Sequence, residues 1–161
     1  MMKKNPAGSY LVAAVRTQDY EGLEEMLRSG TAPDARERDG RTALMEPTMK
    51  DDRRAAEMLL NSGANPDAQD TRGFSALHFA ASDYLPGMAS LLLANGASVD
   101  LRERNGNTPL FRAVFDSRGR GDVIRVLLQH GADKHLSNHH GVSPADLAET
   151  IANYDVRQFM G

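Results

Sequence analysis

The chain of 161 residues contains no cysteine. This absence excludes a disulfide framework, a thiolate metal site and a cysteine nucleophile together. The sequence also has no run that approaches the roughly 20 apolar residues needed to cross a bilayer. The apolar segment LVAAV near the N-terminus is shorter than the core of a signal peptide. A mature cytoplasmic protein without membrane association is therefore expected.

An excess of charge of one sign is also absent. The formal net charge is −3 at pH 7, with 25% charged and 40% hydrophobic residues. This composition is typical of a soluble globular protein. It does not support a dedicated binder of nucleic acid or of anionic membranes, because such proteins gather positive charge. Any electrostatic preference for a partner must therefore come from the local pattern of charges.

Catalytic motifs are lacking as well. The sequence contains no nucleophile elbow, no phosphate loop and no zinc-protease helix motif. The adjacent carboxylates of Asp51 and Asp52, like those of Glu24 and Glu25, would point in different directions on a helix. Neither pair forms an evident acid and base. The sequence predicts a protein that is not an enzyme and has no small-molecule substrate and no cofactor.

What the sequence does contain is a repeat. The segments GRTALM, GFSALH, GNTPLF and GVSPAD begin at glycines that are 33, 33 and 35 residues apart. In the same phase come LLNSGANPDA, LLANGASVDL and LLQHGADKHL, and LVAAV with MLRSGTAPDA forms an incomplete first copy. We predict a single domain over residues 1–161, built from five units at about 7–39, 40–72, 73–105, 106–140 and 141–161.

The recurring positions predict a pair of helices in each unit. The first helix follows a hydroxyl residue that can cap its free N–H groups; these residues are Thr42, Ser75, Thr108 and Ser143. A leucine two positions later is expected to point inward, and Ala80 and Ala81 let neighbouring helices approach closely. The second helix is rich in leucine and ends near Gly63, Gly96 or Gly131, where a left-handed residue terminates a helix at least cost.

This period, with GFSALHFAA and LLANGASVD as its clearest copies, resembles the ankyrin repeat family over residues 7–161. The resemblance implies an all-α solenoid of stacked helix-turn-helix units joined by β-turn fingers. The turn tips and the first helices would line one concave face. It also implies a non-catalytic module that binds a protein partner. One unit cannot cover its apolar faces, so stability is expected to come from stacking.

Histidines are weighed as ligands or catalytic groups at two places. For His78 the resemblance implies a structural role, with hydrogen bonds to the backbone of an adjacent turn. The cluster of His135, His139 and His140 raises the hypothesis of a metal site. Two of these residues are adjacent on a predicted turn, and no cysteine or spaced carboxylate completes a closed site. No metal site is therefore expected.

Two units depart from the pattern. The second has Pro47 and Thr48 in place of two alanines, and an internal proline costs a helix about 3 kcal/mol. Its first helix is therefore predicted to be kinked or delayed, which either reshapes a binding surface or is drift that a stable stack tolerates. The fourth unit has two extra residues around SRGRG, residues 117–121. A solvated loop is favoured there over a phosphate site.

The concave face implied by the resemblance predicts a set of partner-binding residues. From the turns these are Arg36, Arg38, Arg41, Thr71, Arg72, Phe74, Arg102, Arg104, Asn107, His139 and His140. From the first helices they are Arg16, Met49, Lys50, Ser82, Asp83, Phe115 and Asp116. Arginine with aromatic anchors is the mixture enriched at interface hot spots. A protein partner with an acidic contacted surface is predicted. The alternative, that nearby acids on the turns neutralise the arginines, stays open.

A module of this kind is expected to be a monomer when free and to act by covering a surface of its partner. We predict an inhibitor or immunity protein that blocks a toxin or an enzyme. A scaffold or adaptor, and a secreted effector that engages a host protein, are the alternatives. Nucleic acid is disfavoured as a partner because Glu37, Asp39, Asp70 and Glu103 stand among the arginines and would repel phosphates.

Overall fold

The computed structural model describes residues 6–151 and 155–161. Helices follow one another in pairs through these residues, and the last helix is followed by a 3-10 turn. The elements are α1 (Pro6–Arg16), α2 (Tyr20–Arg28), α3 (Met45–Met49), α4 (Arg53–Asn61), α5 (Ala76–Ser82), α6 (Pro86–Ala94), α7 (Pro109–Phe115), α8 (Asp122–Gln129), α9 (Pro144–Thr150) and η1 (Arg157–Phe159). An isolated β-bridge between Arg36 and Thr42 is the only extended pairing in the described part of the chain. The predicted all-α class is confirmed.

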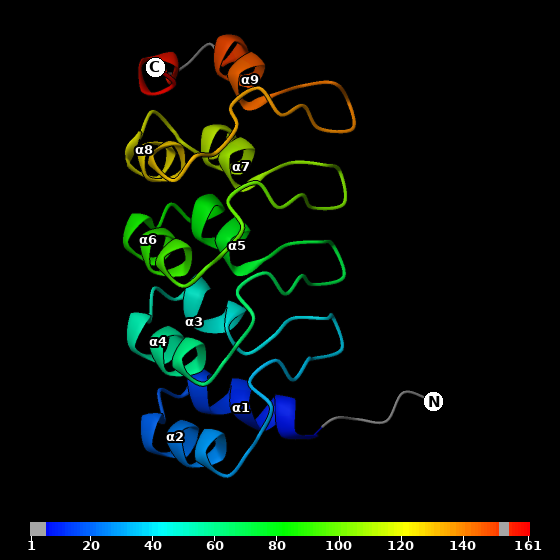
Figure 1. The fold of residues 1–161 in the computed structure, drawn as a ribbon, viewed down its shortest axis with the longest axis vertical. Helices are drawn as coiled ribbons and strands as arrows, with labels where there is room; N and C mark the ends of the chain where they lie inside the picture. The colour runs from blue at the N-terminus through cyan, green and yellow to red at the C-terminus, as the bar shows by residue number, and fades with distance from the viewer. Residues whose placement is uncertain (1–5, 152–154) are drawn as a thin grey trace.

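The elements form three parallel columns (Figure 1). The first helices of the units, α1, α3, α5, α7 and α9, lie above one another in the middle column, and α2, α4, α6 and α8 form a second column beside it with η1 at its end. The loops that join the units project to the opposite side as a row of hairpin-like fingers. We define the fingers as residues 35–42, 68–75, 101–108 and 136–143. The predicted stacked solenoid is confirmed, and none of the described helices is long and apolar enough to span a membrane.

Most helix ends lie where the repeat predicts them. Ser75, Thr108 and Ser143 directly precede α5, α7 and α9 as their N-cap residues. The Thr108 hydroxyl, for example, accepts a hydrogen bond of 3.2 Å from the backbone N–H of Phe111. Glycines follow the second helices with positive φ angles of 88° at Gly63, 87° at Gly96 and 86° at Gly131. Capping at both ends therefore follows from short local motifs.

The first helix of the second unit is the exception. Helix α5 begins one residue after Ser75, whereas α3 begins three residues after Thr42, with Leu44 as its N-cap. The prediction that Thr42 caps this helix is therefore wrong, and the predicted delay is confirmed. Because the helix starts late, Pro47 falls in its first turn, where a missing N–H costs no helical hydrogen bond. The proline thus shortens the helix without breaking it.

One apolar core runs through the whole stack. Leu44, Leu77 and Leu110 are at most 1% exposed, and Ala80 and Ala81 are fully buried between them. The cluster continues from Leu11 in α1 to Met160 beyond η1. A buried leucine contributes about 2 kcal/mol to folding. Since each helix pair covers the apolar face of the next, the stability of one unit depends on its neighbours.

The long loop of the fourth unit is anchored to the third unit. Ser117 and Gly121 at its ends are buried, so the prediction of a solvated loop holds only for the exposed Arg118 and Arg120. The Tyr84 hydroxyl donates to the Arg120 carbonyl, and the Arg120 guanidinium lies 4.0 Å from the centre of the Tyr84 ring. Burial raises the pKa of Tyr84 to about 12. Tyr84 of the third unit therefore holds the long loop of the fourth unit in place.

His78 connects the third unit to the fourth. Its side chain is fully buried. Its Nδ1 accepts a hydrogen bond of 3.2 Å from the backbone N–H of Ser75, so the proton is on Nε2, which donates to the Asn107 carbonyl at 3.1 Å. Burial lowers the pKa of His78 to about 4, which keeps the ring neutral. The predicted structural role is confirmed.

This buried histidine predicts a loss of stability in mild acid. The unfolded pKa of histidine is about 6.5, so the unfolded state binds the proton more readily than the folded state. The contribution of neutral His78 to the free energy of unfolding is complete above about pH 6.5. It falls by about 3 kcal/mol as the pH drops to 4. Urea unfolding at pH 7 and pH 4 measures it.

The variant His78→Met is the control, since Met45 occupies the equivalent position of the second unit. The variant should be less stable than the wild type at pH 7 but should lose less free energy of unfolding on acidification. The two proteins have the same carboxylates, so the comparison isolates the effect of the histidine. If the wild type and the variant lose the same free energy of unfolding on acidification, the buried, neutral His78 is not the cause of the loss.

Candidate protein-binding surface

Hydrogen bonds fix the shape and the spacing of the fingers. Each finger closes on itself through a backbone hydrogen bond of 2.8–3.0 Å: Glu37 to Arg41, Asp70 to Phe74, Glu103 to Asn107 and Asn138 to Val142, with the donor residue first. Neighbouring tips are joined by bonds of 3.0 Å from Thr71 to Asp39, Arg104 to Arg72 and His139 to Asn105. The fingers therefore form one connected row.

Glycine is required where the tips meet. Gly73 has a φ of +84°, and a Cβ atom built on it would lie 2.9 Å from the backbone N of Arg104. Gly40 and Gly106 have φ angles of +80° and meet the next finger at the same distance. No side chain fits without moving the neighbouring backbone. The contact between units therefore sets the glycine at these three repeat starts, whereas Gly141 has a positive φ of 76° but no described atom within 4 Å of its Cβ position.

Side chains at one repeated position strengthen the row. Arg36 donates to the carbonyls of Gly40 at 2.8 Å and Gln69 at 2.6 Å. Gln69 in turn donates to the Arg102 carbonyl at 2.9 Å, and Arg102 donates to the Ser137 carbonyl. Each of these side chains thus ties its own finger to the next. Two of the predicted partner-binding arginines also hold the surface together.

Three other predicted arginines are paired with acids. Arg16 lies 2.7 Å from Glu46 and 3.2 Å from Glu37. Arg41 is paired with Asp39 at 2.6 Å, and Arg72 with Asp70 at 3.2 Å. The exposed pair of Arg41 and Asp39 contributes about 0–1 kcal/mol to stability, whereas Glu46 and Asp70 are buried acids. The alternative of neutralisation by nearby acids holds for these three arginines.

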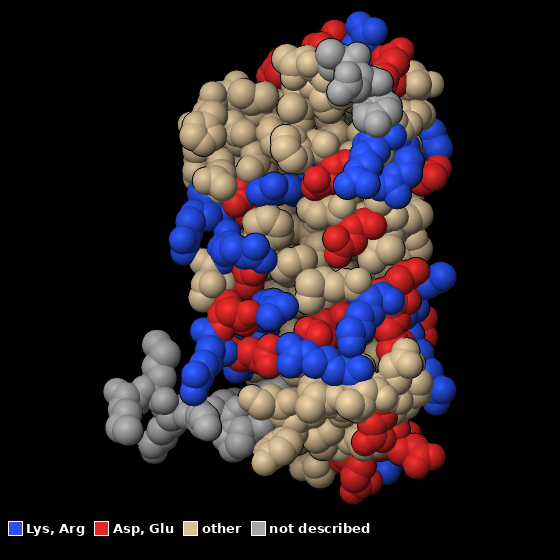
Figure 2. Space-filling view, turned by 180° about the vertical axis from the view of Figure 1, so that it is seen from behind, with Lys and Arg blue, Asp and Glu red and all other residues tan. Residues whose placement is uncertain are grey.

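The remaining finger arginines keep their charge. Arg36, Arg102 and Arg104 are bonded to backbone carbonyls, which do not neutralise a guanidinium, and Arg104 uses the Thr71 carbonyl. Arg38 forms no hydrogen bond or ion pair with any residue that the structure describes. In Figure 2, basic and acidic side chains alternate over the lower part of the surface, so it carries no continuous basic patch. The positive charge is local to particular fingers.

The other predicted residues fall into two groups on this surface. Thr71, His139 and His140 are exposed at finger tips, and Phe74 is half-buried. Near the C-terminal ends of the first helices, Lys50, Asp83 and Phe115 are exposed, while Met49, Ser82 and Asp116 are half-buried. Asn107 is 7% exposed, and its amide is bonded to Glu103 at 2.6 Å and to Asn138 at 2.7 Å. Asn107 is therefore part of the fold and not of the surface.

Reasoning from the sequence missed Arg112 on α7. The Phe74 ring lies between two guanidinium groups, with its centre 4.8 Å from Arg72 and 4.9 Å from Arg112. Arg112 is 3.8 Å from the buried Glu103, and its buried Nε has no hydrogen-bond partner among the described residues. The spacing of three residues from Phe115 could have placed it on the same helix face. The repeat gave no hint, because the equivalent residues are Glu46 and Phe79.

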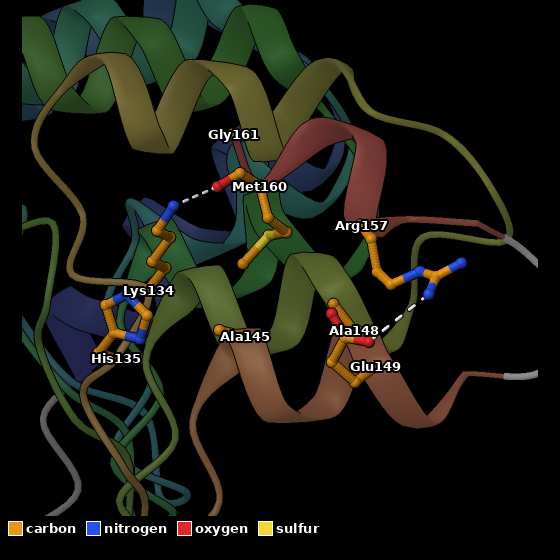
Figure 3. Close-up of a pocket in the computed structure, with 8 residues that line it drawn as sticks. All are labelled: Lys134, His135, Ala145, Ala148, Glu149, Arg157, Met160 and Gly161. Atoms are coloured by element: carbon orange, nitrogen blue, oxygen red, sulfur yellow. Dashed lines mark hydrogen bonds and ion pairs between the residues drawn. The ribbon is translucent and has the colours of Figure 1, made fainter.

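A depression of about 270 Å³ lies at the C-terminal end of the stack, away from the fingers, between α9 and η1 (Figure 3). Arg157 points toward Glu149 across its edge at 3.6 Å, and Lys134 donates to the Met160 carbonyl. His135 also lines the depression, beside Lys134. Over the described ranges, no three His, Cys, Asp or Glu side chains are grouped to hold a metal ion.

The fold and this surface define a repeat solenoid that presents a row of rigid fingers beside the outer faces of its first helices. A sequence model described as ankyrin repeats (3 copies) matches residues 11–101 and residues 48–138. The chain therefore belongs to the ankyrin repeat family. A comparison with curated proteins finds no match. The count of five units stays a prediction.

The contacts between fingers predict unequal costs for two glycine substitutions. Gly73→Ala should lower the free energy of unfolding by about 3 kcal/mol, because it combines a strained positive φ with a clash against the Arg104 backbone. Gly96→Ala, the control, has a similar φ of +87° but open space around its Cβ, and should cost about 1 kcal/mol. Urea unfolding of both variants measures the difference. Equal costs would show that the fingers do not constrain each other.

Proposed function

We propose that this protein is a non-catalytic binding module that holds a protein partner against its fingers and first helices. The observation that carries this proposal is the rigid row of fingers, in which each tip is hydrogen-bonded to the next. A surface that is already ordered loses little conformational entropy on binding. Side chains at the tips can differ from unit to unit without disturbing the backbone that holds them.

The charge on the fingers favours carboxylates on the partner. Arg38 and Arg104 are exposed at the tips of the first and third fingers, and no acid neutralises either of them among the described residues. A planar guanidinium binds a carboxylate with two parallel hydrogen bonds. We therefore propose that acidic residues of the partner contact these two fingers. Phe74, which lies between Arg72 and Arg112, offers an aromatic anchor between them.

The mode of action that fits such a module is inhibition. We propose that the protein acts in the cytoplasm as a monomer and blocks a toxin or an enzyme by covering its active surface, as an immunity protein does. Specific interfaces bury about 1,600 Å² in total. A scaffold would instead hold two partners at once on different faces, and an effector would engage a host protein. Loss of the partner's activity on binding favours the inhibitor, and simultaneous binding of two partners favours the scaffold.

Charge reversal at the two fingers tests the proposed surface. A partner is captured from an extract of the source cells with the intact protein, and its affinity is then measured for the variant carrying Arg38→Glu and Arg104→Glu. Two reversed charges at the contact should weaken binding about tenfold or more and reduce its dependence on salt.

The matched control carries Arg53→Glu and Arg118→Glu, which change the net charge equally at exposed positions outside the fingers. This control should bind as the wild type does. Unchanged affinity in the finger variant, with the fold retained, would exclude the fingers as the site. If both variants bind the partner equally weakly, the loss of affinity comes from the change in net charge and not from the fingers.

A further inference from the structure

Two acids occupy unfavourable positions at the ends of first helices. Asp83 and Asp116 are the C-cap residues of α5 and α7. The last carbonyl groups of a helix carry partial negative charge, so a carboxylate beside them is repelled. The equivalent C-cap of α3 is Lys50, whose charge has the favourable sign. The placement of the two acids is therefore not explained by helix stability.

The two acids also repel each other. Burial and then the charge of Asp116 raise the pKa of Asp83. Among the described residues, neither carboxylate has an ion pair or a side-chain hydrogen bond. The Lys50 Nζ is directed toward the first unit, where it donates to the Arg16 carbonyl at 3.2 Å, and it forms no ion pair with either acid. Arg112, one turn before Asp116, is paired with Glu103. The negative charge at this place is left uncompensated.

An exposed aromatic residue precedes one of these acids at the end of α7. Phe115 precedes Asp116 at the end of α7, and its side chain is 61% exposed. Tyr10 is the other large apolar residue with comparable exposure in the described part of the chain. Ser82, at the position of α5 equivalent to Phe115, is small. An exposed aromatic residue next to charged groups has the composition of an interface anchor.

We propose that Asp83, Phe115 and Asp116 form a docking surface for a segment of the partner that carries a lysine or arginine beside an apolar side chain. We call these three residues the helix-end patch. The proposal rests on the proposed function and adds the chemistry of a second contact. A cation between the two carboxylates would offset their repulsion from each other and from the helix ends. An arginine could also lie over the Phe115 ring.

Selection from a phage-displayed library of random twelve-residue peptides tests the patch without knowledge of the natural partner. The library is selected on the full-length protein, and enriched peptides should carry lysine or arginine close to an aliphatic or aromatic residue. The affinity of an enriched synthetic peptide is then measured by fluorescence anisotropy. Asp83→Asn with Asp116→Asn should weaken it about tenfold, and Phe115→Ala should weaken it to a similar degree.

Two controls separate this result from other causes. Glu24→Gln with Glu25→Gln removes two exposed carboxylates from α2 and should leave peptide affinity within about twofold of the wild type. The double asparagine variant should be at least as stable as the wild type in urea, so that a loss of binding is not a loss of folding.

Several outcomes would overturn the proposal. A basic segment at the patch is excluded if the selected peptides are acidic or bind the double asparagine variant equally well. It is also excluded if the protein enriches no peptide above an uncoated support. A captured partner that binds the double asparagine variant normally but not the Arg38 and Arg104 variant would exclude the patch and leave the proposed function standing. A captured partner that binds the Arg38 and Arg104 variant normally but not the double asparagine variant would support the patch and exclude the fingers as a contact.

Discussion

The structure depends on one constraint, which is that no helix pair can cover its own apolar faces. Each pair must lie on the next at a fixed spacing, and the same spacing must be kept in the fingers, where backbone groups bond across units. Gly73 has no side chain because the Arg104 backbone lies against it, and His78 is neutral because it is buried while it reaches the Asn107 carbonyl. Stability in such a stack is a sum of contacts between neighbours. The side chains that these contacts do not use are free to serve binding.

Features that repeat in phase could be predicted from the sequence, because their physics is local. The caps at Ser75, Thr108 and Ser143, the helix-terminating glycines and the inward leucines each follow from a short motif that recurs. The structural role of His78 was implied by the resemblance to the ankyrin repeat family, since the neighbouring units have no histidine at this position. Arg112 could not be predicted in the same way. Its neighbour Phe74 lies on the preceding finger, and the repeat has different residues at the equivalent positions.

The sequence did not predict which finger arginines pair with an acid and which donate to a backbone carbonyl. Arg41 and Arg72 each find an acid two residues away, whereas Arg36 and Arg102 reach a carbonyl of the next finger. Only the three-dimensional spacing of the fingers decides between these outcomes. The departures show the same limit. Pro47 predicted a kinked or delayed helix, but the choice of a late start over a kink, and the anchoring of the long loop by Tyr84, depend on packing.

The surface that results has two signs of charge in two places. The fingers carry guanidinium groups that backbone carbonyls orient without neutralising, and the ends of α5 and α7 carry carboxylates at positions where helix stability favours the opposite sign. Because the stack keeps the fingers and the helix ends at fixed places, a partner with one acidic and one basic region could match both in a single orientation. The reversed orientation would bring like charges together, and such contacts are strongly unfavourable. Selectivity would then come from the separation of the two signs, and the near-neutral net charge of −3 hides that separation.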